Sequence, residues 1–354
     1  MKHRVQIMKA AMALLVALAW TGLEAHAGPY VFTNFDAPFG TATNAGTGTN
    51  ANGINNNGAA VGFYITANNT FDNFIRNPNG SFTTILANDT AAMAFGINSS
   101  NTVVGVNGQG QAFELKSGGT ATPLVFPTSA GAVASMAFGI NDKGTIVGQY
   151  TNGNDQSPGF ILDGTKFTRI DAPAGPDVVN AQGINNNGQI VGFYVGNDGN
   201  FHGFMANEKD AKNGQLTGTP LADPTIPNVP GEPGATFVFS QILGINDQGI
   251  AVGYYGDSTT SQHGFLYNTK TGQYTFLDDP SEQFSNGGVE VTQITGINNA
   301  GEITGFYSDA NGIFHGFVAS PAVTATPEPA SLTLLGIGLV GLAGYGWRRR
   351  KLTV

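Results

Sequence analysis

The chain has 354 residues, of which 41% are hydrophobic, 51 are glycine and none is cysteine, and its formal net charge is −9. The absence of cysteine excludes a disulfide framework and a thiolate metal site, and the apolar fraction is too high for wholesale disorder. Residues 28–326 hold 8 basic against 22 acidic residues, a balance that repels phosphate backbones and argues against nucleic-acid binding.

Residues 1–27 have the pattern of a signal peptide. Three basic residues precede an apolar run at residues 10–20, and an Ala-His-Ala tripeptide ends at Ala27. Small residues in this arrangement predict cleavage by signal peptidase between Ala27 and Gly28, and therefore export. The alternative is an N-terminal membrane anchor, for which the apolar run is short.

A repeat fills most of the chain between residues 50 and 320. The tripeptide Gly-Ile-Asn occurs six times, at intervals of 43, 43, 44, 61 and 52 residues. Each copy continues with a short polar turn, four residues of strand character and a glycine, and a third short strand ends in phenylalanine. Four short strands in roughly 43 residues are typical of one blade of a β-propeller.

Three positions recur in every copy and carry the turn and strand predictions. The asparagine of the tripeptide precedes the turn, a glycine or asparagine closes the turn, and a second glycine follows four residues later. The closing residue predicts φ > 0, as in a primed hairpin turn, and the later glycine predicts a bulge or the crowding of inner strands around an axis. These positions are Asn55, Gly58, Gly62, Asn98, Asn101, Gly105, Asn141, Gly144, Gly148, Asn185, Gly188, Gly192, Asn246, Gly249, Gly253, Asn298, Gly301 and Gly305.

The two ends of the array predict how it closes. The sixth copy stops after its third strand, whereas residues 30–38 resemble the fourth-strand segment at residues 167–173. We therefore expect an all-β, six-bladed β-propeller in which the N-terminal strand completes the last blade and no edge is left open. An open array of β-hairpin units is the alternative.

The spacing and the His-Gly-Phe tripeptides at His202, His263 and His315 resemble the extracellular HAF repeat family. The resemblance covers residues from about 50 to 320. It implies export and a repeat architecture, and it carries no catalytic residues.

The same three histidines and two acidic turns are the candidate ligand sites. Three histidines at one repeat position suggest a metal triad, but they converge only if they face the axis, and we favour packing or turn bonding as the explanation. Turns at residues 197–200 and 309–312 offer oxygen ligands for Ca²⁺, although turn formation alone accounts for them. We therefore expect no cofactor, with Ca²⁺ as the only candidate ion.

Residues 207–235 form a Pro/Gly-rich insert in the fourth copy. Insertions in repeat proteins fall on loops and often on the binding face, and a tolerated surface loop is the alternative. No nucleophile elbow, zinc-protease motif or phosphate loop occurs, and no carboxylate pair can be singled out for glycoside chemistry.

The C-terminal segment, 327–354, follows a linker at residues 321–326. It begins with Pro327, Glu328 and Pro329, continues with an almost uncharged stretch long enough to cross a bilayer as a helix, and ends in basic residues. The basic residues are Arg348, Arg349, Arg350 and Lys351. This order resembles the PEP-CTERM sorting signal of Gram-negative bacteria, which implies transient anchoring in the inner membrane, processing by an exosortase-type enzyme and transfer to the cell surface or matrix. A plain membrane anchor is the alternative.

Two functions follow from these features. The first is a non-enzymatic surface or extracellular-matrix protein with a structural or adhesive role, associated with exopolysaccharide. The second is a secreted carbohydrate-binding or carbohydrate-active propeller enzyme, for which aromatic and asparagine side chains would suit sugar recognition.

Overall fold

The computed structural model describes residues 30–154, 156–227, 234–283 and 289–322. Almost all of them belong to one compact unit, Val31–Ser320. The expected signal peptide, its cleavage site at Ala27 and Gly28, and the segment 327–354 lie outside the described residues. Within the described ranges, no helix has the length and apolar character needed to cross a membrane.

The unit Val31–Ser320 is all-β, and each repeat copy forms a small antiparallel sheet. Copy 1 comprises β2 (Gly48–Ile54), β3 (Ala60–Ile65), β4 (Phe71–Arg76) and β5 (Phe82–Ile85). Copy 2 comprises β6 (Met93–Ile97), β7 (Val103–Val106), β8 (Ala112–Leu115) and β9 (Thr122–Pro123). Copy 3 comprises β10 (Ala132–Ile140), β11 (Ile146–Asn152), β12 (Gly159–Asp163) and β13 (Lys166–Asp171).

The later copies repeat this order. Copy 4 comprises β14 (Val179–Ile184), β15 (Gln189–Val195), β16 (Phe201–Asn207) and β18 (Thr219–Pro220). Copy 5 comprises β19 (Phe237–Ile245), β20 (Ile250–Asp257), β21 (Gln262–Asn268) and β22 (Gln273–Phe276). Copy 6 comprises β23 (Thr292–Ile297), β24 (Ile303–Ser308) and β25 (Phe314–Pro321), and β1 (Tyr30–Phe35) pairs with β25.

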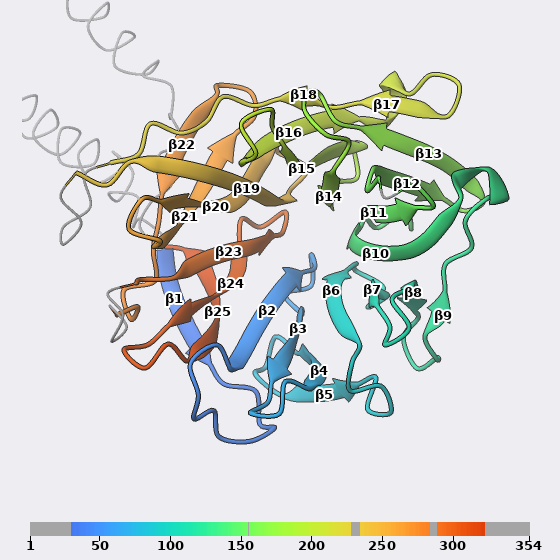
Figure 1. The fold of residues 1–354 in the computed structure, drawn as a ribbon. Coiled ribbons are helices and arrows are strands. Elements are labelled where there is room, and N and C mark those ends of the chain that lie inside the picture. Colours follow the sequence, from blue (N-terminus) through green and yellow to red (C-terminus); the bar gives the residue numbers. More distant parts are fainter. Residues whose placement is uncertain (1–29, 155, 228–233, 284–288, 323–354) are drawn as a thin grey trace, which may run out of the picture. The chain divides into compact units, whose positions relative to one another are not determined.

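The arrangement is β-propeller-like. Figure 1 shows the first strands of the copies (β2, β6, β10, β14, β19 and β23) nearest the middle of this unit, with the later strands farther out. The sheets of copies 6 and 1 are joined by one parallel bridge between Gly48 and Phe314, so the five sheets include one of eight strands.

Hydrogen bonds between copies run in a closed cycle. The side-chain amide of each tripeptide asparagine donates to the backbone carbonyl of the equivalent asparagine in the next copy, over 2.9–3.2 Å. The sixth of these bonds, from Asn298 to Asn55, spans 243 residues and returns to the first copy. We call this set the asparagine ring: Asn55, Asn98, Asn141, Asn185, Asn246 and Asn298.

Close approach of the first strands explains the glycine of each tripeptide. A Cβ on Gly53 would lie 2.7 Å from the Phe95 carbonyl oxygen, and one on Gly296 would lie 3.1 Å from the Cα of Gly53. The isoleucine that follows is at most 8% exposed in every copy. These side chains form the isoleucine ring: Ile54, Ile97, Ile140, Ile184, Ile245 and Ile297.

The second glycine of each copy lies at a bulge, which is one of the two expected environments, and not at the axis. Its Cβ would lie only 1.9–2.0 Å from a carbonyl oxygen of the first strand of its own copy, next to a register shift in that strand. In copy 4 the ring of Phe204 also covers Gly192. The requirement for glycine therefore comes from the bulge and the buried phenylalanine within each sheet, and the crowding at the axis falls on the tripeptide glycine.

The core lies between neighbouring sheets. Val147 and Ile170 of copy 3 pack in one cluster with Val179, Ile190 and Phe204 of copy 4. The third-strand phenylalanine is fully buried in every copy. In copies 2 to 5 it packs in one cluster with residues of its own copy and of the preceding copy. The six phenylalanines are Phe74, Phe113, Phe160, Phe204, Phe265 and Phe317.

The N-terminal strand contacts both ends of the array. Phe32 packs edge-on against Phe317 of copy 6, with ring centroids 5.1 Å apart. Phe35 packs against Phe74 and Phe82 of copy 1, and the Arg76 guanidinium lies 4.8 Å from the centre of its ring. The sequence prediction that β1 supplies the strand missing from copy 6 is confirmed by its pairing with β25.

The insert at residues 207–235 is more than a surface loop. Within its described part, β17 (Gln215–Thr217) adds a parallel fifth strand to the sheet of copy 3, and β18 supplies the fourth strand of copy 4. Leu216 is 6% exposed and lies in the core between these two copies. The Pro/Gly-rich composition conceals these short strands.

Candidate functional site

Each side chain of the asparagine ring makes hydrogen bonds through both its oxygen and its amide group. In copy 4 the Asn185 side-chain oxygen accepts from the backbone N–H groups of Asn187 and Gln189, each at 3.0 Å, while its amide donates to the Asn246 carbonyl at 2.9 Å. One residue thus fixes its own turn and ties its sheet to the next. All six ring asparagines are at least 94% buried.

The turn after each ring asparagine differs from the primed type predicted from the sequence. Within each of these turns, only the closing residue has a positive φ, between 56° and 85°. A primed turn of type I′ needs positive φ at two central residues, so these are three-residue loops closed by one left-handed residue. The closing residues are Gly58, Asn101, Gly144, Gly188, Gly249 and Gly301.

Two narrow cavities lie along the axis, on either side of the isoleucine ring. Their volumes are about 60 and 80 Å³, far below the several hundred Å³ typical of small-molecule sites. The axis therefore offers room for water or an ion and excludes a sugar.

The smaller cavity has a polar mouth with two carboxylates, Asp142 and Asp247. The Asn186 amide donates to both, at 3.1 and 3.0 Å, and the Asn56 amide donates to Asp142 at 2.9 Å. Burial opposes ionisation of Asp142, but hydrogen bonds from Ser99, Asn186 and Asn56 outweigh it and lower the pKa of its carboxyl. This mouth is negatively charged and its carboxylates are held by amide donors.

A larger cavity, of about 650 Å³, lies between copies 1 and 2. Its lining combines aliphatic side chains such as Ile85 and Leu115 with hydroxyl and amide groups such as Thr84 and Asn101, and Lys116 lies at its edge. A volume of this size accommodates a small ligand. Sequence reasoning missed it because no motif marks residues that come from four different strands and loops.

Each of the three histidines lies between two aspartates of its own, an arrangement that we call a cage. The imidazole of His202 contacts Asp223 at 2.9 Å and Asp198 at 3.0 Å, and that of His315 contacts Asp36 at 2.8 Å. A tyrosine ring from the neighbouring strand packs on each imidazole, at 5.1–5.9 Å between ring centres. In the described part of the chain, the structure does not gather these histidines into one triad, since each has its own carboxylate partners.

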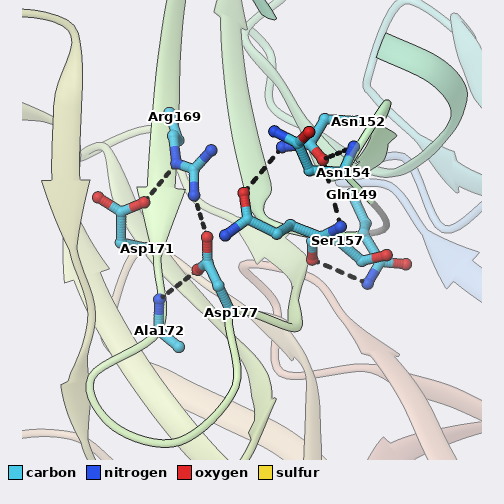
Figure 2. Close-up of polar contacts among 9 residues, drawn as sticks. Gln149, Asn152, Asn154, Ser157, Arg169, Asp171, Ala172 and Asp177 are labelled. Carbon is cyan, nitrogen blue, oxygen red and sulfur yellow. Dashed lines mark hydrogen bonds and ion pairs between the residues drawn. The ribbon is translucent and has the colours of Figure 1, made fainter. Parts of the chain in front are cut away.

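The third copy replaces the histidine cage with an arginine. Pro158 occupies the position equivalent to the histidines, opposite Tyr150, and Arg169 from β13 pairs with Asp171 and with Asp177 (Figure 2). The Asp177 carboxylate also accepts from the backbone N–H of Ala172, at 3.2 Å. Asp171 ends the fourth strand of copy 3, and Asp36, Asp223 and Asp278 stand close after the corresponding strand of other copies. A basic side chain beside this aspartate is therefore a recurring feature of four copies.

The fifth copy has the most acidic cage. His263 is fully buried and its Nδ1 lies 3.0 Å from Asp278, while its Nε2 lies 4.0 Å from Asp257. Burial, reinforced by the charge of Asp278, raises the pKa of Glu282 to about 8. Sequence reasoning missed the glutamates of this cage, because they belong to the irregular segment between β22 and β23.

The turns proposed as Ca²⁺ sites use their carboxylates for local bonds. Asp309 accepts from the backbone N–H groups of Asn311 and Ile313, at 2.8 and 2.9 Å. Asp198 accepts from the Asn200 N–H at 3.1 Å, and the hydrogen bond from His202 lowers the pKa of Asp198 to about 2.

The cage of His315 predicts a small pH dependence of stability. The hydrogen bond to Asp36 raises the pKa of His315 against the opposing effect of burial. Because the folded protein binds this proton more tightly than the unfolded chain does, the protonated imidazole stabilises the fold below about pH 6.5. This stabilisation is lost as the pH rises through the pKa of the folded state. We expect Asp36→Asn to cost less than about 1 kcal/mol at pH 6, because the carboxylate is largely exposed, and less still at pH 9.

Urea unfolding at the two pH values measures this difference. Asp163→Asn is the control, since Asp163 is exposed and lies outside every cage. An equal loss at both pH values would contradict the role of the charged imidazole.

Comparison with known proteins identifies one motif and several distant structural likenesses. Residues 325–351 match the PEP-CTERM protein-sorting motif, which confirms the prediction from the C-terminal residues and implies an exported protein. No match was found among curated proteins.

The similar solved structures are all distant. TolB from Acinetobacter baumannii has a TM-score of 0.44 at 14% identity, over 74% of this chain and 63% of that chain. A fungal lectin from Aleuria aurantia, described as a six-bladed β-propeller, has a TM-score of 0.41 at 9% identity, over 85% and 98%. A mutant of AofleA from Arthrobotrys oligospora has a TM-score of 0.47 at 10% identity, over 82% and 86%. Similarities of this size carry no argument about the function of this chain.

Proposed function

We propose that this chain is an exported repeat protein, sorted through its C-terminal motif to the cell surface or extracellular matrix, where it has a structural or adhesive role in association with exopolysaccharide. The observation that carries the proposal is the sorting motif at residues 325–351. In this proposal signal peptidase cuts after Ala27, an exosortase-type enzyme processes the tail, and the repeat domain performs no catalysis.

The repeat domain suits such a role because its copies support one another. In the proposal they form a closed six-bladed propeller of HAF-type repeats. The hydrogen bond from Asn298 to Asn55 and the pairing of β1 with β25 support closure, because both join the last copy to the first part of the domain. A ring without free sheet edges resists local opening and edge-to-edge aggregation.

Removal of residues 327–354 should change where the protein is found. We expect the truncated chain to leave the membrane and surface fractions and to collect in the periplasm or medium, because it no longer carries the sorting motif. Immunoblots of separated fractions measure this. A matched control replaces Pro327, Glu328 and Pro329 by alanine and leaves the apolar stretch intact, which separates sorting from anchoring. An unchanged distribution of both variants would contradict the proposal.

The second candidate is recognition of a sugar in the cavity between copies 1 and 2. The volume of about 650 Å³ and the hydroxyl and amide groups in its lining favour it. A glycan array combined with a reducing-sugar release assay on the full chain separates the two candidates: turnover would identify an enzyme, and binding lost in Thr84→Val would identify this cavity as a lectin site.

A further inference from the structure

The cage of copy 5 differs from its counterparts in charge. It shares with the cages of His202 and His315 an imidazole between two aspartates, here Asp257 and Asp278. Glu282 and Glu290 add two more carboxyl groups. Four acidic groups thus surround one imidazole, which carries at most one positive charge.

The added glutamates converge with the histidine. One ligand atom each from His263, Glu282 and Glu290 can be chosen so that all three lie within 4.8 Å of one another. Ligand atoms about 2.1 Å from a tetrahedral metal ion are separated by about 3.4 Å, so side-chain shifts of about 1 Å would complete such a site. In the part of the chain that the structure describes, this is the only such group.

An unsatisfied carboxylate oxygen faces the same imidazole. The Asp257 side chain is fully buried, its Oδ2 accepts no hydrogen bond, and that atom lies 4.0 Å from Nε2 of His263. Buried anionic oxygens without donors are costly, and in native proteins they are paired or coordinate metal ions. This oxygen is independent of the glutamates and indicates a cation on the Nε2 side of the ring.

We propose that His263, Glu282 and Glu290 bind a divalent transition-metal ion of the zinc class, with Asp257 as a further carboxylate facing the ion. A nitrogen ligand combined with carboxylates suits zinc, whereas Ca²⁺ takes oxygen ligands only. Asp278 is a positioning residue: its contact with Nδ1 at 3.0 Å orients the ring. The site would tie Glu282 and Glu290 to strand β21.

Zinc titration of the full-length chain tests this proposal. The protein is purified without an affinity tag, treated with a chelator, and titrated with Zn²⁺ and, separately, Ca²⁺ by calorimetry. We expect one zinc ion per chain, a Tm that rises with zinc concentration, and no calcium binding at this site. Co²⁺ in place of zinc should give the visible absorption of a site with nitrogen and oxygen ligands.

Three variants and two controls make the assignment specific. Glu290→Gln and Glu282→Gln should each weaken zinc binding at least tenfold, and Asp278→Asn about 10- to 100-fold. His315→Gln and Glu302→Gln should leave the affinity unchanged, because neither residue belongs to the copy 5 cage. Circular dichroism confirms that each variant is folded. Absence of stoichiometric zinc binding, or an affinity equal to that of the parent in either glutamate variant, would overturn the proposal.

Discussion

Replacing Gly192 by alanine should prevent stable folding of the repeat domain. The new Cβ would lie 1.9 Å from the Asn180 carbonyl oxygen and 2.8 Å from the ring of Phe204, which is fully buried. Neither neighbour can withdraw, since one is the backbone of a paired strand and the other fills the core. We expect the free energy of unfolding to fall by about 4 kcal/mol or more, in the range that marks severe steric conflict.

Soluble yield and urea unfolding measure this effect. Gly153→Ala is the matched control, because a Cβ there would meet nothing within 4 Å and the position has no positive φ. A Gly192→Ala protein within about 1 kcal/mol of the parent would show that the strand relaxes around the methyl group.

Replacing Asn185 in the asparagine ring by alanine should strongly destabilise the repeat domain. It removes the acceptor of two partly buried backbone N–H groups and the amide donor of one buried carbonyl. Each buried group left unsatisfied costs about 1–3 kcal/mol, so we expect a loss of about 3 kcal/mol or more. Asn185→Asp keeps the acceptor and should lose less than alanine does.

The control for this series is Asn187→Ala, which removes one exposed hydrogen bond to the Asp247 carbonyl. Its unfolding midpoint in urea should stay close to that of the parent. If Asn185→Ala were equally mild, water would be replacing the ring hydrogen bonds, and the cycle could not be a main source of stability.

The repeat could be predicted from the sequence because each letter of Gly-Ile-Asn has one physical role. Glycine allows neighbouring first strands to approach, isoleucine fills the axis, and asparagine joins a turn to the next copy. Few other residue types can fill these roles, so the tripeptide recurs in all six copies. The strand missing from copy 6 was predictable for the same reason: residues 30–38 keep the character of a fourth strand although they lie at the other end.

Other features left no periodic trace. The strand β17 pairs with copy 3 through backbone groups, which residue types do not reveal in a Pro/Gly-rich insert. The glutamates near His263 come from an irregular segment, 19 and 27 residues farther along, and no spacing rule connects them. Two of the aspartates did leave a signal: Asp36, which contacts His315, and Asp171, which pairs with Arg169, each begin an Asp-Ala-Pro sequence at the end of a strand.

Because β1 pairs with β25, the domain can be completed only when the last repeat copy is present. β1 leaves the ribosome and crosses the membrane first, yet its partner begins at Phe314, and the contact between His315 and Asp36 spans 279 residues. Bringing such distant segments together is slow, because the chain loses the entropy of the whole intervening loop before any contact compensates for it. A product cut short anywhere before copy 6 keeps β1 without a partner and exposes a strand edge. Quality-control proteases that recognise exposed edges would therefore remove incomplete chains and spare finished ones.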